Sequence, residues 1–345
     1  MYRYNFQNDY SEGAAPRILE ALTKTNFTQE LGYSEDQYCL EAAALIRHSI
    51  DNEEADIHFV SGGTQANIIM LSSSLRSFES VIAVESGHIC VHETGAIEAT
   101  GHKINTIKGK EGKVTAAEIE AVVAGHGDEH MVKPRVVFIS HSSEVGTIYT
   151  AKELREIAAT CKKLNLYLYL DGARLGSALT SKAADLTIKE LSSLVDAFYI
   201  GGTKNGALLG EVMVINNPLL KPDFRYHIKQ KGGLLSKGRV LGIQFLELFK
   251  DNLYFDLARH ANAMAERLTH GITDLGYSFQ TNSPTNQIFP ILPNKVIHEL
   301  SHHYRFYVWA KVDDEQSSIR LVTSWATRED AVDEFVKDLA GLTSM

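Results

Sequence analysis

Uninterrupted apolar runs are the feature of this chain that most restricts its fold. The segments "VVFI" (136–139) and "LYLYL" (166–170) show no alternation of apolar and polar residues. A strand with one solvated face alternates, whereas parallel strands covered by helices are buried on both faces and lose the alternation. These runs therefore predict a mostly parallel β-sheet with helices packed against it.

Segments with helical spacing alternate with the expected strands as far as residue 215. Strands are expected at 55–63, 80–86, 135–142 and 166–174, and helices at 64–75, 116–126 and 151–165. The first of these helices repeats its apolar residues at the helical period, at Ala66, Ile69, Met70 and Leu75. The recurring strand, helix and strand unit predicts an α/β domain.

The pattern changes after about residue 245. A long amphipathic helical segment (241–276) is followed by two expected antiparallel strands (305–313 and 317–327) and a closing helix (328–342). Because 345 residues are many for one core, we expect three parts. These are an N-terminal arm (1–15), a large α/β domain (16–245) and a small C-terminal α+β domain (246–345).

Charge and cysteine content exclude several classes of partner. The net charge is −9 with acidic and basic residues mixed along the chain, which argues against nucleic acid or an anionic membrane as the main partner. Cys39, Cys90 and Cys161 show no CxxC spacing, which favours a reducing compartment. The polar start lacks the apolar core of a signal peptide, and no apolar run approaches the ~18 residues of a membrane span. We expect a cytoplasmic protein that acts on a small molecule.

Polar residues gather where the expected strands end, which is where open α/β sheets bind ligands. Gly62, Gly63 and Thr64 follow one strand, and they suit either a phosphate at a helix N-terminus or a plain N-capped turn. Asp171 follows a fully apolar strand, and a buried carboxylate needs a cation. That cation is either Arg174, three residues on, or a protonated nitrogen of a ligand.

Lys204 lies in a run of small residues between two apolar segments, thirty-three residues after Asp171. A lysine at such a position forms either a Schiff base or an ordinary salt bridge. His88, past another strand, offers a flat ring that stacks on a planar ligand.

Histidine pairs raise the alternative of a metal site. His92 follows His88 by four residues with Glu93 beside it, and "HELSHH" places His298 four residues before His302, with His303 next to it. Histidine is abundant in this chain, and the spacing implies no further ligand. We therefore expect no metal.

Taken in order, a phosphate cup, a flat ring, a buried acid and a lysine are what pyridoxal 5'-phosphate needs. The acid keeps the pyridine nitrogen protonated, which makes the ring an electron sink. The lysine holds the aldehyde of the cofactor. The ordered set thus favours the chemical interpretation of Lys204 over a structural one.

At these residues the chain resembles the pyridoxal-phosphate-dependent enzymes of the aspartate aminotransferase fold (fold type I). Within them it is most similar to the low-specificity L-threonine aldolases of the β-eliminating lyase group. The matching segments are "SGGTQAN", "HICVHETGA", "YLDGARLG", "GGTKNGALLG" and "RLVTSWAT". The resemblance implies a seven-stranded, mostly parallel sheet with helices on both faces, and a smaller C-terminal α+β domain.

The resemblance also implies roles for the residues of the cofactor site. Gly63 and Thr64 would bind the phosphate, and His88 would stack on the ring. Asp171 would pair with the pyridine nitrogen, and Lys204 would be the Schiff-base lysine.

For the substrate carboxylate, the resemblance implies Arg320, with Asn8 of the arm near the site. Arg174 would lie against either the phenolic oxygen of the cofactor or the substrate carboxylate. Arginine suits this task because its planar fork binds a carboxylate bidentately. Tyr33 matches a family tyrosine that a neighbouring subunit contributes, so a homodimer or homotetramer is implied. The basic phosphate ligand beyond Lys204 has four candidates, Arg225, Lys229, Lys231 and Lys237, of which Lys229 and Lys237 are also candidates from the neighbouring subunit.

One segment departs from the family. The family histidine that faces the substrate side chain is replaced within "SHSSEVGT", where Glu144 falls at about its position and His141 lies three residues earlier. Either residue is a candidate base.

The implied activity is retro-aldol cleavage of a β-hydroxy-α-amino acid such as L-threonine or L-allo-threonine, giving glycine and an aldehyde. β-Elimination, racemisation and transamination are alternatives with the same apparatus. A metal-dependent hydrolase built on His88, His92 and Glu93, and a non-catalytic binding module, are alternatives from other classes.

Overall fold

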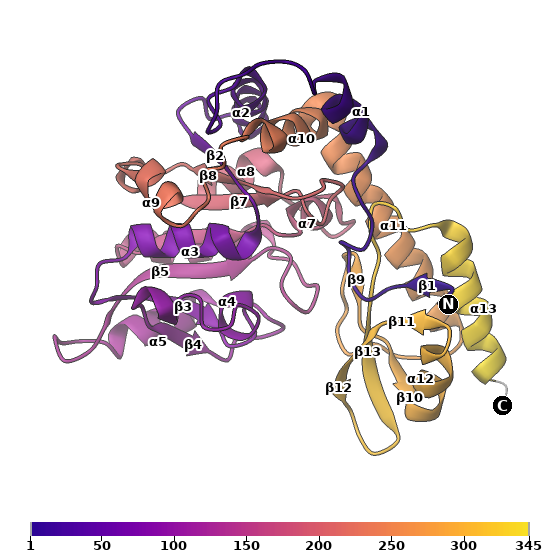
Figure 1. The fold of residues 1–345 in the computed structure, drawn as a ribbon. Coiled ribbons are helices and arrows are strands. Elements are labelled where there is room, and N and C mark those ends of the chain that lie inside the picture. The colour runs from indigo at the N-terminus through magenta and orange to yellow at the C-terminus, as the bar shows by residue number, and fades with distance from the viewer. Residues whose placement is uncertain (1, 344–345) are drawn as a thin grey trace.

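The larger part of the chain is built on one seven-stranded sheet. The protein is described by a computed structural model covering residues 2–343 (Figure 1). The strand order is β2-β8-β7-β6-β5-β3-β4. The strands are β2 (Asp56–Val60), β3 (Glu79–Val84), β4 (Ile104–Ile107), β5 (Lys133–Ser140), β6 (Tyr167–Asp171), β7 (Ala197–Gly201) and β8 (Glu211–Ile215). All neighbours from β4 to β7 are parallel, and β8 is antiparallel to both β2 and β7. The predicted mostly parallel sheet is therefore confirmed.

The two faces of this sheet carry separate apolar cores, as expected for strands without alternation. Phe138 and Tyr169 point to one face, and Ile139 and Leu170 to the other. The first face is covered by α3 (Gly63–Ser74), α4 (His88–Val91) and α9 (Phe224–Gln230). The second is covered by α1 (Pro16–Lys24), α2 (Gln37–Ile50), α5 (Ala116–Ala124), α6 (Ala151–Lys163), α7 (Leu175–Thr180), α8 (Ile188–Leu194) and α10 (Arg239–Phe249). Helices thus cover both faces, as predicted.

A smaller unit with its own core follows in the sequence. Its sheet has the strand order β10-β13-β12 and is extended by β9. The helices of this unit pack against the sheet, in the part of Figure 1 where both N and C are marked. Its elements are α11 (Leu253–Asp274), β9 (Gln287–Ile288), β10 (Ile291–Pro293), α12 (Asn294–Ser301), β11 (Tyr304–Arg305), β12 (Tyr307–Lys311), β13 (Gln316–Val322) and α13 (Glu329–Thr343). β12 and β13 are antiparallel, as expected.

The predicted long helix of residues 241–276 is wrong as one element. α10 ends at Phe249, and a short 3-10 turn (Lys250–Asn252) separates it from α11. Asp251 and Asn252 take the left-handed conformation, with φ of 51° and 65°, which no helix continues through. α10 packs in the larger core, whereas the second half of α11 packs in the smaller one. We propose this break, rather than residue 245, as the domain boundary.

The N-terminal arm joins the two units. β1 (Tyr4–Asn5) pairs in parallel with β11, and Phe6 is fully buried in the smaller core. The chain then crosses toward the larger sheet before α1 begins. Two further 3-10 turns span Glu98–Thr100 and Pro218–Leu220. Within residues 2–343, no helix combines the length and apolarity that crossing a bilayer requires.

Gly172→Ala is expected to destabilise the fold. A Cβ at Gly172 would lie 1.9 Å from the backbone oxygen of Tyr199 in the adjacent strand. Because backbone cannot yield as a side chain does, we expect a loss of about 2–3 kcal/mol in the free energy of unfolding. Denaturant unfolding checks this. Gly127→Ala is the matched control, since an added Cβ there meets nothing within 4 Å, and equal stabilities of the two variants would contradict the prediction.

Candidate active site

Several of the residues singled out in the sequence, Asp171 and Lys204 among them, lie at or just beyond the carboxyl ends of the parallel strands. Asp171 is the last residue of β6, and β7 ends at Gly201, three residues before Lys204. The backbone N–H of Gly201 donates to the oxygen of Gly172 at 2.9 Å, and that of His141 donates to the oxygen of Asp171 at 2.9 Å. These bonds fix the ends of β5, β6 and β7 against one another.

The Asp171 carboxylate is buried, with 4% of the residue exposed, and it is held by neutral donors. The Tyr199 hydroxyl donates to Oδ1 at 2.5 Å, the Ala173 N–H donates to Oδ1 at 3.0 Å, and the Asn67 amide donates to Oδ2 at 3.2 Å. In the described part of the chain, no cation forms an ion pair with it. A buried carboxylate without a cation is costly, so the carboxylate suits a positively charged ligand atom.

Arg174 is not the partner of Asp171. Its guanidinium binds the Asp9 carboxylate bidentately, at 2.7 and 3.1 Å, and Asn286 donates to the same carboxylate at 2.9 Å. The Asp9 side chain is fully buried and that of Arg174 is 9% exposed. Burial raises the pKa of Asp9, but Arg174 and Lys204 outweigh it, so the pKa is lowered.

Asp9 escaped the sequence analysis, which named its neighbour Asn8. The Asn8 side-chain oxygen accepts from the Tyr10 N–H and from the Ser11 hydroxyl, both at 3.0 Å. Asn8 therefore forms a local turn, and Asp9 is the arm residue that reaches the site. A buried arginine such as Arg174 needs a carboxylate partner, and this need was the one feature of the sequence that could have led to Asp9.

His88 is joined to Asp171 through two buried side chains. His88 Nδ1 lies 2.8 Å from Glu93 Oε1, and Asn67 donates to the same Glu93 oxygen at 2.8 Å as well as to Asp171. Burial lowers the pKa of His88, but the Glu93 hydrogen bond and the charges of Glu144 and Asp171 raise it overall. Glu93 is buried and bound to His88, whereas His92 is exposed, and among residues 2–343 these three side chains are not a cluster with ligand atoms within 4.8 Å of one another.

The start of α3 keeps its amides free of side-chain caps. Gly62 is the N-cap residue and offers no side chain, whereas α5, α6 and α8 each begin with a threonine in a capping box. The first amides of a helix then remain available to an anion. At Gly63 a Cβ would lie 2.8 Å from the Tyr199 hydroxyl, so only glycine leaves room for the tyrosine that bonds Asp171. Thr64 follows in the first turn.

Lys204 is half-buried and its ammonium has no hydrogen-bond or ion-pair partner among residues 2–343. Burial, followed by the charge of Arg174, lowers the pKa of Lys204, against the opposing effects of Asp9, Glu144 and Asp171. The neutral amine, which is the nucleophilic form, is thereby favoured.

Glu211 is a second residue that the sequence analysis missed. It opens β8, is 5% exposed, and accepts from the Gly202 N–H at 2.8 Å. Burial raises the pKa of Glu211 to about 7, although the Gly202 bond and the Lys204 charge oppose this. The signal was an acid at the start of the apolar segment "EVMVI". Glu211 thus braces the turn that carries Lys204.

Arg320, on β13, has no carboxylate partner in the described part of the chain. Its guanidinium lies 5.1 Å from the Tyr307 ring and 5.0 Å from the Trp309 ring, and it donates to the Gln7 oxygen at 3.4 Å. Its Nε is buried with no hydrogen-bond partner. Burial and the charge of Arg174 lower the pKa of Arg320. The side chain is therefore placed to receive an anion.

The two candidate bases differ in their surroundings. His141 is 2% exposed, and its Nδ1 accepts from the Tyr149 N–H at 3.3 Å. Burial lowers the pKa of His141 to about 4, so the ring is a weak base within the core. Glu144 is half-buried, and its charge raises the pKa values of His88 and Lys204. Glu144 therefore lies beside the site, whereas His141 is a buried residue that supports the loop carrying Glu144.

The residues expected from a neighbouring subunit lie apart from Lys204, on the outside of the chain. Lys229 Nζ is 4.6 Å from the ring of Tyr33, which is 43% exposed. Arg225 donates to the Tyr33 backbone oxygen and pairs with Glu35, at 2.9 and 2.8 Å. Lys237 is exposed and Lys231 half-buried. None of these contacts reaches Asp171.

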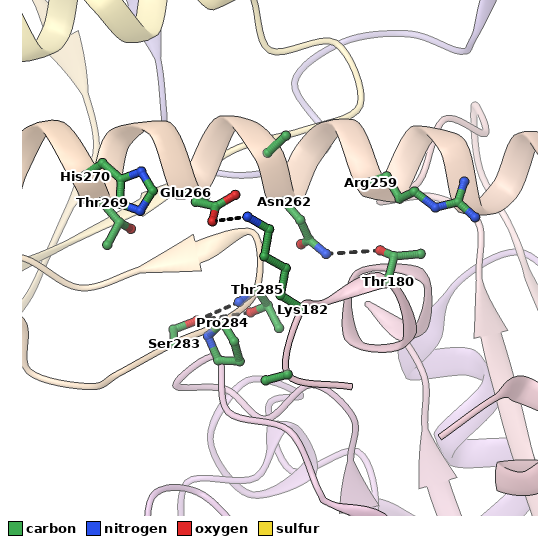
Figure 2. Close-up of a pocket in the computed structure, with 12 residues that line it drawn as sticks. Thr180, Lys182, Arg259, Asn262, Glu266, Thr269, His270, Ser283, Pro284 and Thr285 are labelled. Carbon is green, nitrogen blue, oxygen red and sulfur yellow. Dashed lines mark hydrogen bonds and ion pairs between the residues drawn. The ribbon is translucent and has the colours of Figure 1, made fainter. Parts of the chain in front are cut away.

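A cavity of about 620 Å³ lies between the start of the smaller unit and the segment that follows β6 (Figure 2). It is lined by residues after α7, by α11 and by residues 283–285, and by none of the predicted site residues. Ser283 and Thr285 each donate to the Gly146 oxygen at 3.0 Å. The loop that carries Glu144 is thereby fastened to the smaller unit.

This arrangement of sheet, arm and strand-end residues defines an α/β enzyme of the aspartate aminotransferase class. The chain aligns with an aspartate aminotransferase of Thermus thermophilus at a TM-score of 0.72 and 13% identity, covering 99% of this chain and 91% of that one. At such identity the likeness concerns the fold alone.

Sequence comparison narrows the class. Residues 6–294 match the beta-eliminating lyase family, and the chain belongs to that family. A low specificity L-threonine aldolase of Pseudomonas sp. is 35% identical, over 98% of each chain. The structure of a threonine aldolase of Leishmania major is 48% identical, with a TM-score of 0.97 over 99% of each chain.

Lys204→Met is expected to stabilise the ligand-free protein at pH 7. Because the pKa of Lys204 is lowered on folding, folding carries a free-energy cost that is full below the folded pKa and is lost as pH rises past about 10.4. Removing an unpaired buried cation should therefore add about 1 kcal/mol at pH 7, and less at pH 10.

Urea unfolding at the two pH values measures this difference. Lys189→Met is the control, because Lys189 pairs with Asp51 at the exposed surface and should contribute under about 0.5 kcal/mol. A less stable Lys204→Met protein at pH 7 would show that the amine is not desolvated.

Proposed function

We propose that this protein cleaves the Cα–Cβ bond of L-threonine or L-allo-threonine to give glycine and an aldehyde, with pyridoxal 5'-phosphate as cofactor. The names of the Pseudomonas and Leishmania relatives support the reaction. The observation that carries the proposal is the pair Asp171 and Lys204. One is a buried acid without a cation and the other a half-buried amine without a partner, and both lie at the ends of adjacent strands.

The residues present fit the cofactor. The uncapped start of α3 at Gly63 and Thr64 would hold the phosphate, and His88 would lie against the ring. Asp171 would supply the charge partner of the ring nitrogen, and Lys204 would hold the aldehyde carbon. When bound, the cofactor accepts the electron pair released from the broken Cα–Cβ bond.

Arg320 is proposed to bind the substrate carboxylate. Its Nε is buried without a partner, and its ring contacts with Tyr307 and Trp309 fix the guanidinium plane. Arg174 is already occupied by Asp9, so its role is to position the arm and to add positive charge. Asn8, engaged in its turn, would contribute at most through a bond that replaces those to Tyr10 and Ser11.

Glu144 is proposed as the base that takes the proton of the β-hydroxyl group, directly or through one water. As that O–H bond breaks, the C=O bond of the aldehyde forms and the Cα–Cβ bond breaks. A proton delivered to Cα then completes glycine. His141 is less suited, because its Nδ1 is engaged with Tyr149 and its pKa is about 4.

A second copy of the chain is proposed to complete the site. Tyr33, Lys229 and Lys237 would reach the neighbouring copy, in a homodimer or a homotetramer. Large exposed apolar side chains support this, since Phe27 is 94% exposed and Tyr226 is 78% exposed. The cysteines are free, which accords with the cytoplasmic location expected from the sequence.

The first test is aldehyde release from L-threonine by the purified protein, coupled to a reductase and read at 340 nm. We expect a yellow protein that releases aldehyde and glycine in equal amounts. Lys204→Ala should lose at least about 10³-fold in kcat, because no amine remains to hold the cofactor. The control is Lys182→Ala, an exposed lysine that pairs with Glu266. 2-Oxobutanoate and ammonia as products would instead indicate β-elimination, and D-allo-threonine would indicate racemisation at Cα.

Substitutions at Glu144 test the base. Glu144→Gln should lower kcat by about 10²-fold or more, because the amide takes up no proton. Glu144→His should retain activity but move the acidic limb of the kcat profile up by about two pH units, the difference between ordinary glutamate and histidine side chains. An unmoved acidic limb in Glu144→His would assign the base to another group.

A further inference from the structure

Residues 298–302, "HELSH", place two histidines four positions apart with a glutamate directly after the first. On a helix, residues i and i+4 lie on the same face, and this His-Glu-x-x-His spacing is one by which helices bind zinc. The reaction proposed above leaves these residues without a role. They belong to the smaller unit, on α12.

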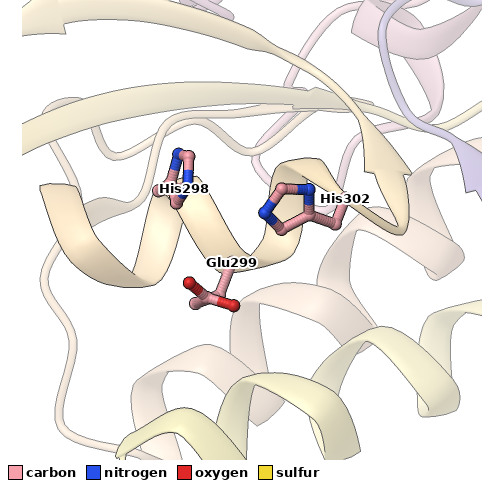
Figure 3. A group of neighbouring side chains, drawn as sticks. All are labelled: His298, Glu299 and His302. Atoms are coloured by element: carbon pink, nitrogen blue, oxygen red, sulfur yellow. The ribbon is translucent and has the colours of Figure 1, made fainter.

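The structure brings the three side chains together. His298 and Glu299 lie in the last turn of α12, and His302 is its C-cap residue with helical φ and ψ of −70° and −26°. One ligand atom of each lies within 4.8 Å of those of the other two. Figure 3 shows both imidazole rings on this turn, and their centroids are 4.9 Å apart.

The helix is fixed while the three side chains stay free. Val296, Ile297 and Leu300 on the same helix are buried in the smaller core. His298, Glu299 and His302 are all exposed. Within residues 2–343, none of the three side chains is in a hydrogen bond or an ion pair. Small rotations about their side-chain bonds therefore bring the donor atoms to the ~2.0–2.2 Å of a metal bond without moving the backbone.

The chemistry of the donors selects the ion. Two imidazole nitrogens and one carboxylate oxygen suit Zn²⁺, Ni²⁺, Co²⁺ and Cu²⁺, whereas Ca²⁺ and Mg²⁺ prefer oxygen ligands. The negative end of the α12 dipole faces the same turn and favours a cation. We propose that His298, Glu299 and His302 bind one divalent transition-metal ion on the surface of the smaller unit.

The site is a binding site and not the centre of a hydrolase. In catalytic sites of this spacing the glutamate acts as a base, and a third protein ligand comes from elsewhere in the chain. Here Glu299 itself lies within reach of the ion and is exposed. None of the described cavities includes these residues. Binding of the ion would stabilise the last turn of α12, because the ion would link His298 to His302 across the end of the helix.

The test uses tag-free full-length protein, titrated with Zn²⁺ and with Ni²⁺ by isothermal calorimetry. We expect one ion per chain. His298→Ala and His302→Ala should each weaken binding by about tenfold or more, since even the partners of metal ligands are worth that much. Glu299→Gln should weaken it as well. His303→Ala is the matched control, an exposed neighbour outside the cluster, and should bind as the parent does.

A second readout follows thermal unfolding. Zn²⁺ should raise the melting temperature of the parent and of His303→Ala in a concentration-dependent way, because an ion that binds only the folded state stabilises it. At the same Zn²⁺ concentration it should raise that of His302→Ala by clearly less. The proposal is overturned if no ion binds stoichiometrically below millimolar concentration. It is equally overturned if His298→Ala and His302→Ala bind as tightly as the parent.

Discussion

The buried carboxylate of Asp171 is the constraint around which the site is arranged. Tyr199 and Asn67 satisfy its oxygens with hydrogen bonds, but neutral donors do not balance its charge. The same demand explains Gly63, because the Tyr199 hydroxyl fills the space that a Cβ would take. Asn67 also donates to Glu93, and Glu93 is hydrogen-bonded to His88, so the position of Asp171 restricts these two side chains as well. One carboxylate thus constrains these five residues and leaves a place for one cation.

A second buried pair decides which arginine remains available. Arg174 and Arg320 lie near enough that the charge of Arg174 lowers the pKa of Arg320. Asp9 binds Arg174 through both oxygens and leaves Arg320 with a buried Nε that has no hydrogen-bond partner within residues 2–343. The arm that carries Asp9 starts in the smaller unit, where Phe6 is buried. The packing of the smaller unit therefore holds the Asp9 carboxylate on Arg174, and Arg320 remains available for the proposed binding of a substrate carboxylate.

The parts of the site that could be predicted from sequence are those at strand ends. Asp171 and Lys204 each follow an apolar run, and parallel strands bring such ends to one edge of the sheet. The missed residues depend on distant segments: Asp9 reaches Arg174 across 165 positions, and Asn67 reaches Asp171 across 104. No local pattern encodes such contacts. The helix break at Asp251 was missed for another reason. The helical spacing of apolar residues continues across it, so the sequence gives no sign that the helix ends there.

Glu144 stands at the segment where the sequence analysis expects a departure from the family, and its charge acts on the rest of the site. A carboxylate, unlike a neutral imidazole, raises the pKa values of the cations near it, here Arg174, Lys204 and Arg320. Burial lowers the pKa of Lys204, and the negative charge of Glu144 partly offsets this lowering. When Glu144 takes up a proton, the offset is lost and the pKa of Lys204 falls further. Because Ser283 and Thr285 hold the Gly146 oxygen, a shift of the smaller unit would also shift Glu144. If Arg320 binds the substrate carboxylate as proposed, a movement of the smaller unit on binding would reach Lys204 through this loop.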